Sequence, residues 1–425
     1  MVGFLKSNFF FLPALVLAFL LYSRAVQAKN TAPYRSLVLP QDAAMFLGKV
    51  CAPPSMASGR ARYCKARLKL ERVWSKSGLA AKAFGEADFF IPAELCEIYQ
   101  PGKLYTKWRG KKTDLLVDQG ALLLLDARLF KRLQDSPVIF ESKNIFSCRY
   151  DDGFAGTFQK IRALSRLHFA RLMFAWGDSG GLFLALLSGN RSYLSKDSAD
   201  AFKNAGLSHV LALSGMHLSL LGGLAFALGK KGFGKRAARL LQFLAILAFV
   251  WFAGKSPSLF RALLCSLASI GAGAFKIQEK SPPNLLSLVF IVHVCLFPLD
   301  AFELSFMLSY GALFGIFFFN EICSKALSNK MPEGAGVSLG ASAGAQFFTL
   351  PLSLKFFGVF APAGVVSSAV ISPFVTLFVY TGLVFVLISL CFPALAPICG
   401  LLLKKYYLLL SRAVFFFAGL PCLKI

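Results

Sequence analysis

The chain has 425 residues, of which 56% are hydrophobic and 45 are phenylalanine, and its formal net charge is +25. This composition excludes an ordinary water-soluble protein and indicates an integral membrane protein. Between Ala28 and Arg171 there are 25 Lys and Arg against 13 Asp and Glu, a net of +12 that cytoplasmic loops do not explain. The surplus predicts a polyanionic partner, either nucleic acid or the anionic headgroups of a membrane.

The N-terminal segment, residues 1–27, contains an apolar run over 9–23 that follows Lys6. It ends before Val26-Gln27-Ala28, a sequence of the kind found at cleavage sites. We therefore expect either a signal peptide or an uncleaved transmembrane anchor. Both alternatives place the next region outside the cytoplasm.

Residues 28–152 are predicted to form an exported basic β domain. Short segments that alternate apolar and polar residues, the period of a half-buried strand, are separated by turns rich in Gly, Pro or charge. The predicted strands are 45–51, 64–71, 87–91, 103–108, 114–117, 121–127 and 137–146. Several short strands favour a small barrel or sandwich, and an OB-like barrel fits the length and the basic surface.

Aromatic residues lie among the cations of this domain, as on surfaces that stack the bases of single-stranded nucleic acid. The alternative is a solvated basic face with one or two aromatic residues in the core. The candidate DNA-binding residues are Arg67, Lys69, Arg72, Trp74, Lys107, Trp108, Arg109, Lys111 and Lys112.

Four of the ten cysteines, namely Cys51, Cys64, Cys96 and Cys148, fall in the β domain. In an oxidising compartment they could form two disulfides, with three connectivities that the sequence does not distinguish. Cys51 and Cys64 flank a turn that contains Pro, Ser and Gly, which favours this pair. The other six cysteines are expected to pack as small hydrophobic side chains.

Residues 153–205 are predicted to lie at the membrane surface. Between 155 and 176, apolar residues recur at helical spacing and Lys and Arg occupy the other faces, as in an interfacial helix. The next apolar run, 182–187, is too short to span a membrane, so we expect it to re-enter the membrane or to dock on it.

Residues 206–425 form the polytopic part. The predicted spans are 206–228, 238–254, 257–275, 284–299, 304–322, 336–353 and 364–391. The segment 397–420 contains three cations and is predicted to be an interfacial helix or a poor last span. Placing the basic loops in the cytoplasm puts residues 28–205 outside. The fold class is an α-helical polytopic membrane protein with an exported small β domain near its N-terminus.

The first predicted span of this part contains a ladder of polar residues, His209, Ser214, His217 and Ser219. Polar groups at membrane depth usually face the interior of the bundle or a water-filled path. The two histidines are separated by about 12 Å of helix rise, too far for both to bind one metal ion. We therefore expect no metal site.

Arg261 stands one turn into a predicted span, where a charge is costly unless the side chain snorkels or pairs. Its predicted partners are Asp300 and Glu303. Two interpretations follow, a structural ion pair or a cation that faces a passing phosphate backbone.

Several motifs between residues 185 and 380 follow one another in the order of a known family. They are Gly206-Leu207-Ser208-His209 with Ser214-Gly215 and His217, Ser256-Pro257-Ser258 with Arg261-Ala262, Asp300 with Phe302-Glu303-Leu304-Ser305-Phe306, Leu350-Pro351, and Ser367 to Pro373. The set resembles the ComEC/Rec2 family of competence proteins. The chain departs from the family at Asn190, Glu303 and Ser368, where the family more commonly has Asp, Gln and Asn.

The resemblance implies transport of single-stranded transforming DNA across the inner membrane during natural competence, with residues 206–425 as the channel. The implied path is lined by His209, Ser214, His217, Arg261, Asp300, Glu303, Ser305 and Ser309. The implied partners are single-stranded DNA, membrane lipids, an outer DNA receptor, a cytoplasmic helicase or ATPase, a separate nuclease and further copies of the chain. No cofactor is implied.

The sequence contains no phosphate-loop motif and no His-x-His-x-Asp-His metal motif. It thus resembles family members without the C-terminal metallo-β-lactamase-type domain, and we expect no enzymatic activity. Two other function classes stay open. A small-solute or lipid-linked transporter would leave the basic domain without a role. A rhomboid-like intramembrane protease would use Ser214 with His293, but Ala212 replaces the first Gly of that motif.

Overall fold

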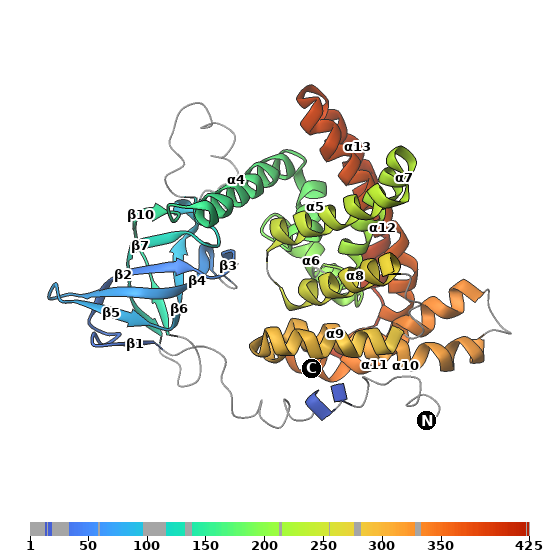
Figure 1. Ribbon diagram of the computed structural model, residues 1–425, viewed down its shortest axis with the longest axis horizontal. Helices are drawn as coiled ribbons and strands as arrows, with labels where there is room; N and C mark the ends of the chain where they lie inside the picture. Colours follow the sequence, from blue (N-terminus) through green and yellow to red (C-terminus); the bar gives the residue numbers. More distant parts are fainter. Residues whose placement is uncertain are drawn as a thin grey trace. The chain divides into compact units, whose positions relative to one another are not determined.

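The structure is a computed structural model. It describes residues 13–14, 16–18, 34–57, 60–96, 116–131, 138–211, 215–254, 256–275, 282–327, 333–421 and 423–424. The chain divides into two compact units (Figure 1). We call residues 29–175 the β unit, and residues 1–28 with 176–425 the helical unit.

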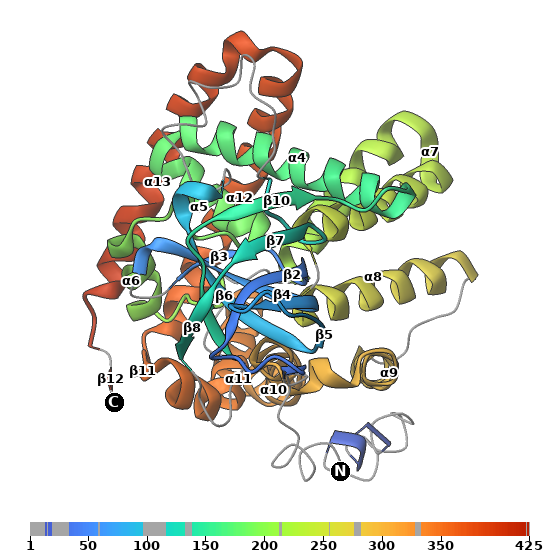
Figure 2. The same cartoon turned by 90° about the vertical axis from the view of Figure 1, so that its left-hand side faces the viewer.

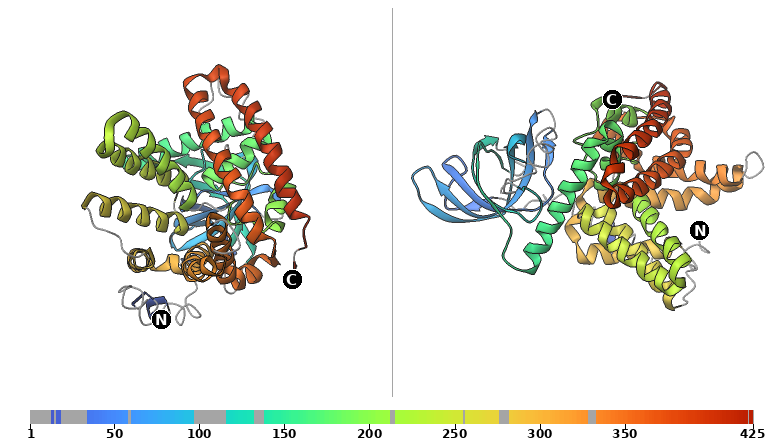
Figure 3. Two further views of the ribbon diagram at one scale, coloured as in Figure 1. Left: turned by 90° about the vertical axis from the view of Figure 1, so that its right-hand side faces the viewer. Right: turned by 90° about the horizontal axis from the view of Figure 1, so that it is seen from above.

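The β unit is built on one curled sheet. Its strands are β1 (Arg35–Ser36), β2 (Ala43–Val50), β3 (Ser55–Ala57), β4 (Arg60–Ser75), β5 (Ala80–Phe84), β6 (Glu86–Pro92), β7 (Leu122–Asp126), β8 (Arg128–Lys131), β9 (Ile139–Glu141) and β10 (Ile145–Arg149). The main order is β10-β7-β2-β4-β6-β9-β8, and β6 pairs with β9 in parallel (Figure 2). The order has two ends, so the sheet forms a half-barrel (Figure 3). Its identity as an OB fold stays a prediction.

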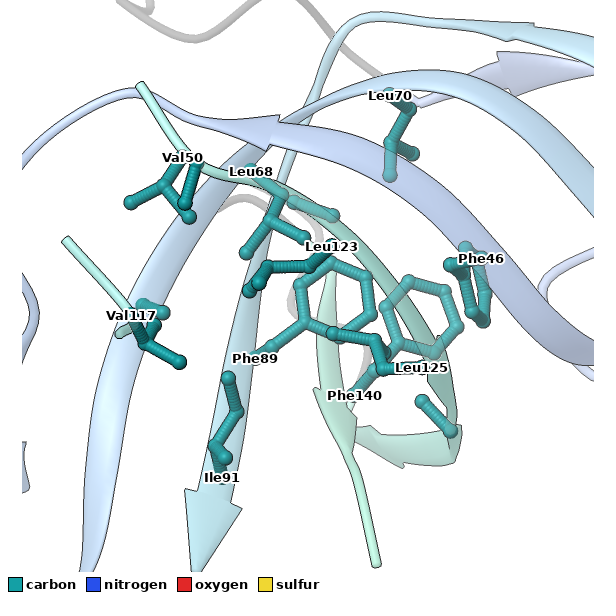
Figure 4. Close-up of a cluster of buried hydrophobic side chains, with 14 of the residues drawn as sticks. Phe46, Val50, Leu68, Leu70, Phe89, Ile91, Val117, Leu123, Leu125 and Phe140 are labelled. Atoms are coloured by element: carbon teal, nitrogen blue, oxygen red, sulfur yellow. The ribbon is translucent and has the colours of Figure 1, made fainter. Parts of the chain in front are cut away.

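Alternating apolar residues of the strands fill the inside of the half-barrel (Figure 4). The rings of Phe46, Phe89 and Phe140 form its centre, with centroids 4.4 to 5.3 Å apart. The register of β2 and β4 shifts between Leu47 and Gly48, which bends the pair. A Cβ on Gly48 would lie 2.8 Å from the Lys69 carbonyl oxygen, so this close approach requires glycine.

Period-2 patterning found most of these strands. The predictions at 45–51, 64–71, 87–91 and 121–127 are confirmed as β2, β4, β6 and β7, and 137–146 contains β9 and the start of β10. The predicted strand 103–108 and residues 114–115 lie outside the described residues, and the remaining residues of the predicted strand 114–117 are not in a strand. The prediction missed β1, β3, β5 and β8, which are all short.

Helix α4 (Phe154–Ala175) belongs to the β unit and packs on its core through Ala163 and Leu167. The helix is confirmed, but Arg162 and Arg166 are buried rather than turned to solvent. Both arginines have polar partners there. Arg162 donates a hydrogen bond to the side-chain oxygen of Gln119 at 2.8 Å, and Arg166 Nε lies 3.4 Å from the Asp118 carboxylate. Phe154, Phe158 and Ile161 are exposed, whereas Leu167 of the predicted apolar face packs on the core, and the interfacial position of the helix stays a prediction.

The helical unit contains α5 (Gly177–Ser188), α6 (Lys196–Asn204), α7 (Gly215–Ala253), α8 (Pro257–Phe275), α9 (Pro282–Leu296), α10 (Leu304–Leu327), α11 (Glu333–Phe357), α12 (Gly364–Cys391) and α13 (Ala396–Ala418). A 3-10 turn, η3 (Pro298–Phe302), joins α9 to α10. Among the described residues, His217–Ala253, Gly364–Cys391 and Pro393–Ala418 are long and apolar enough to cross a membrane. The third of these covers the segment predicted as interfacial or as a poor last span.

Two predicted elements of the helical unit differ from the structure. The interruption of α7 is not one of them. Gly234 has φ 81°, so α7 consists of two helices joined by a turn, which agrees with the separate predicted spans 206–228 and 238–254. However, α7 begins at Gly215 and residues 208–210 form a turn, because Gly206 has the left-handed φ 74° and stops the preceding helix. The predicted ladder therefore does not lie on one helix. The apolar run 182–187 lies in α5 and is buried inside the unit.

Candidate functional site

Five polar residues of the helical unit meet where α8, α9, η3 and α10 pack together. They are Arg261, His293, Asp300, Ser309 and Tyr310, and we call them the polar cluster. Arg261 is 7% exposed and His293 is 0% exposed, so the cluster is almost completely removed from the surface of the unit. Polar groups in such surroundings are costly unless each has a hydrogen-bond or charge partner.

The start of α8 places Arg261 in the cluster. Ser256 caps this helix, because its hydroxyl oxygen accepts a hydrogen bond from the Leu259 amide at 3.3 Å, and Pro257 is the first helical residue. Arg261 is consequently fixed one turn into the helix. A side chain there points toward α10 and toward the first turn of α7, where a Cβ on Gly215 would lie 3.3 Å from Nη2.

Within the part of the chain that the structure describes, the Arg261 guanidinium has polar neighbours but no carboxylate partner. Nη1 donates to the Ser309 carbonyl oxygen at 3.0 Å, and Cζ lies 5.9 Å from the centroid of the Tyr310 ring. Throughout the described part of the chain, no ion pair with Arg261 is found. The predicted pairing with Asp300 or Glu303 is therefore wrong. Asp300 lies against His293 instead, and Glu303 is exposed at the start of α10.

His293 joins Asp300 to Tyr310. Its Nε2 lies 3.3 Å from the Asp300 carboxylate, and its Nδ1 lies 3.1 Å from the Tyr310 hydroxyl. The rings of Phe260 and Phe306 stand at an angle to the imidazole, each with a centroid distance of 5.0 Å. Both ring nitrogens thus have a polar partner inside an aromatic enclosure, and a serine could reach His293 only by displacing one of them.

The other predicted path residues are only partly brought together. His217 is buried in the first turn of α7, next to Gly215, and Ser309 contributes its carbonyl group to Arg261. The Ser305 hydroxyl is buried and lacks a hydrogen-bond partner among the described residues. His209 is exposed in the turn before α7, and Ser214 lies outside the described residues. Sequence reasoning missed Tyr310 altogether and considered His293 only as a protease residue.

The outer face of the sheet holds the candidate DNA-binding residues. Cross-strand register places Lys69, Arg72 and Trp74 of β4 on the same face as Lys82 of β5. The three cations are exposed and Trp74 is half-buried, so this face combines positive charge with an accessible ring. We call these four residues the basic face. The predicted residues Lys107, Trp108, Arg109, Lys111 and Lys112 lie outside the described residues.

Arg67, by contrast, is engaged within the β unit. Its Nε lies 2.8 Å from one oxygen of Asp88, and the Lys65 ammonium lies 2.8 Å from the other. Burial acts to raise the pKa of Asp88, but hydrogen bonds and charge from Arg67 and Lys65 outweigh it and hold the pKa below its usual value. Two cations and one carboxylate form this group, so it adds less positive charge to the surface than two free cations would.

The cysteines of the β unit are free thiols, and the favoured pairing of Cys51 with Cys64 is not the contact found. The Cys51 thiol lies 3.7 Å from the Lys49 carbonyl oxygen. Cys64 is instead near Cys96, and the interaction of the two thiols, followed by burial, raises the pKa of the Cys96 thiol. The turn between Cys51 and Cys64 did not predict the neighbour of Cys64. This residue is buried in the curled sheet, where β4 pairs with β6 and β6 is followed by Cys96. No cluster of three metal-ligating side chains occurs among the residues that the structure describes.

Comparison with known proteins agrees with the ordered motifs. A family model described as "Competence protein" matches residues 186–425. The chain is 29% identical over 208 residues to ComE operon protein 3 of Bacillus subtilis (strain 168), which covers 49% of this chain and 26% of that relative. No solved structure matches the chain. Because the family model covers more than half of its length, the chain belongs to the ComEC/Rec2 family of competence proteins.

Proposed function

We propose that the protein carries single-stranded DNA across the inner membrane during natural competence, with the helical unit as the channel. The observation that carries the proposal is Arg261, a buried cation with no ion-pair partner among the described residues. An isolated charge in such a place costs several kcal/mol, and an anion that visits the site removes much of this cost. A phosphodiester group is such an anion, and guanidinium groups bind phosphate through paired hydrogen bonds.

The basic face of the β unit supports the same proposal independently. Exposed cations attract a polyanionic strand, and an aromatic ring among them stacks on bases of any sequence. In this proposal residues 28–205 lie outside the cytoplasm, in a multi-pass protein of the plasma membrane, and the basic face gathers the strand. An outer DNA receptor, a cytoplasmic helicase or ATPase and a separate nuclease complete the pathway.

Uptake of labelled DNA into a DNase-protected pool tests the proposal. A deletion strain is complemented with wild type, Arg261→Gln, Arg261→Lys or Arg236→Gln, the last being a control at an exposed arginine of the helical unit. We expect Arg261→Gln to lower uptake by about tenfold or more, since it removes a charged contact with the strand. Arg261→Lys keeps the charge but loses the paired donors, so its DNA uptake should lie between that of wild type and that of Arg261→Gln.

Surface binding of DNA should persist in the deletion strain, because it precedes transport. Normal uptake by the deletion strain, or by Arg261→Gln at an equal protein level, contradicts the proposal. The transporter alternative predicts that removal of the β unit spares activity. The protease alternative needs a free imidazole nitrogen, whereas Tyr310 and Asp300 occupy both nitrogens of His293.

A further inference from the structure

The polar cluster forms one continuous chain of contacts from a buried carboxylate to a buried cation. Asp300 contacts His293, His293 contacts Tyr310, and the Tyr310 ring lies beneath the Arg261 guanidinium. An ionised carboxylate only accepts hydrogen bonds, so the neutral imidazole donates from Nε2 to Asp300 and accepts the Tyr310 hydroxyl hydrogen at Nδ1. If Nδ1 gains a proton, the tyrosine hydroxyl needs only to rotate and accept. Both protonation states of His293 therefore keep the same hydrogen-bonded partners.

The charge of the cluster depends on this proton. With a neutral imidazole, Arg261 and Asp300 sum to zero, and with an imidazolium the cluster carries one positive charge. Among the described residues, the other titratable side chains near the cluster are Tyr310 on α10, Cys265 on α8, which is close enough to act on Arg261 and Tyr310, and the buried His217 on α7, two residues from Gly215. Tyrosine and thiol side chains are ordinarily neutral near pH 7. Glu303 and Cys295, which also lie on flanking elements, are exposed.

We infer that His293 is a proton-binding site coupled to the phosphate site at Arg261, so that each phosphate that occupies the site favours uptake of a proton. The inference rests on the proposed function. A phosphodiester carries one negative charge, which the cluster balances only when the imidazole is protonated. In a buried site such charge interactions are strong, because little water screens them. Linkage is reciprocal, so protonation of His293 must strengthen phosphate binding by the same factor. The proton comes from water, and no covalent bond other than N–H is formed.

Histidine NMR of the full chain in neutral lipid nanodiscs tests the coupling directly. The chain has four histidines, so selective ¹³C labelling gives a simple spectrum in which His293→Gln identifies one signal. The signal is followed against pH alone, with a short oligo-dT, and with the same oligo-dT carrying an uncharged methylphosphonate backbone. We expect oligo-dT to raise the titration midpoint of His293 by about one pH unit or more, and the uncharged form to leave it unchanged.

Variants separate this inference from the proposed function. Arg261→Gln should abolish the shift of the His293 midpoint, and His168→Gln, at an exposed histidine of the β unit, should leave it intact. If oligo-dT does not change the titration midpoint of His293 while DNA uptake still requires Arg261, the coupling is wrong. The phosphate site at Arg261 is then still supported. Uptake that is indifferent to Arg261 overturns the proposed function itself. Tyr310→Phe keeps the ring under Arg261 and changes no charge, so the shift should persist in this variant, and its loss would contradict a coupling that is carried by charge.

Discussion

At the scale of single residues, Asp88 shows how the β unit manages its charge. The carboxylate is 1% exposed and has two cations within 2.8 Å. Its pKa is lowered in the folded chain, because hydrogen bonds from Arg67 and Lys65 outweigh the effect of burial. A carboxyl group with a lowered pKa stabilises the fold above its unfolded pKa of about 4. This contribution is lost as the pH falls through the folded pKa.

We expect Asp88→Asn to lower the free energy of unfolding of the β unit by about 2 kcal/mol at neutral pH, since the negative charge is lost and one of the two acceptor oxygens becomes an NH2 donor that faces a cation. The difference from wild type should shrink as the pH falls below about 4. Hydrogen exchange of β-unit amides in the full-length protein measures both effects. Glu71→Gln is the matched control, because Glu71 is exposed on the same strand. A difference that grows in acid would contradict the assignment.

The paired thiols of Cys64 and Cys96 make a second prediction for single residues. Both are completely buried, and the raised pKa of Cys96 leaves little reactive thiolate at neutral pH. We expect iodoacetamide to modify Cys51, which is only half-buried, at least about tenfold faster than Cys96 in the folded protein. Peptide mass spectrometry measures both rates, and urea should make them similar. Equal rates without urea would mean that the Cys96 environment is open.

Residue types alone predicted part of the polar cluster and missed the rest. Arg261 stands out in the sequence because a cation inside an apolar helix is costly. Tyr310 does not, because a tyrosine in such a helix resembles any aromatic core residue until packing brings a polar partner to its hydroxyl. The predicted Arg261–Asp300 pair was wrong for a related reason, since η3 turns Asp300 toward His293. Contacts between helices cannot be derived from spacing along one helix.

At the scale of elements, α10 and α11 approach each other closely at a glycine crossing. Gly315 and Gly344 face each other across it, and a Cβ on either would overlap the backbone of the other helix. Small residues at helix crossings allow such approach and the packing contacts that come with it. Gly311 lies one turn earlier on α10, and a Cβ there would be in ordinary contact, 4.0 Å from the Phe348 carbonyl oxygen.

We therefore expect Gly315→Ala to destabilise the unit by about 1–3 kcal/mol through overpacking. Gly311→Ala should be neutral, or stabilising by up to about 1 kcal/mol, since alanine favours helix more than glycine does. Thermal unfolding of the full-length protein in detergent, read from circular dichroism, compares the two variants. Equal melting temperatures would show that the α10–α11 crossing has room for a methyl group at Gly315.

The elements themselves were predictable to a different degree in each unit. Long apolar segments and strand alternation report burial directly, so most helices and the strands β2, β4, β6 and β7 were found. The start of α7 was not, because the left-handed Gly206 ends the regular structure inside an unbroken apolar pattern. Helix α4 was found, but the side on which Arg162 and Arg166 lie depends on Asp118 and Gln119, which no helical periodicity reveals.

At the scale of the whole molecule, the net charge of +25 has to serve both membrane topology and a polyanionic partner. The basic face of the β unit allows these roles to be separated, because phosphate contacts and base stacking respond differently to salt. Each cation that contacts phosphate contributes about 0.7 to the slope of log affinity against log salt for single strands. Stacking on an aromatic ring contributes affinity but releases no counterions, so it leaves that slope unchanged.

We expect Arg72→Ala and Lys82→Ala each to lower the salt slope for oligo-dT binding by about 0.7, in full-length protein held in neutral lipid nanodiscs. Trp74→Ala should weaken binding by about 1–3 kcal/mol and leave the slope as in wild type. Lys49→Ala is a control, because the Lys49 ammonium is already paired with the Asp151 carboxylate. If Trp74→Ala has no effect on oligo-dT while Arg72→Ala and Lys82→Ala mainly weaken binding to anionic vesicles, the basic face serves the membrane surface. If Arg72→Ala lowers the salt slope and Trp74→Ala lowers only the affinity for oligo-dT, the ligand must present both phosphates and bases. Lipid headgroups present no bases.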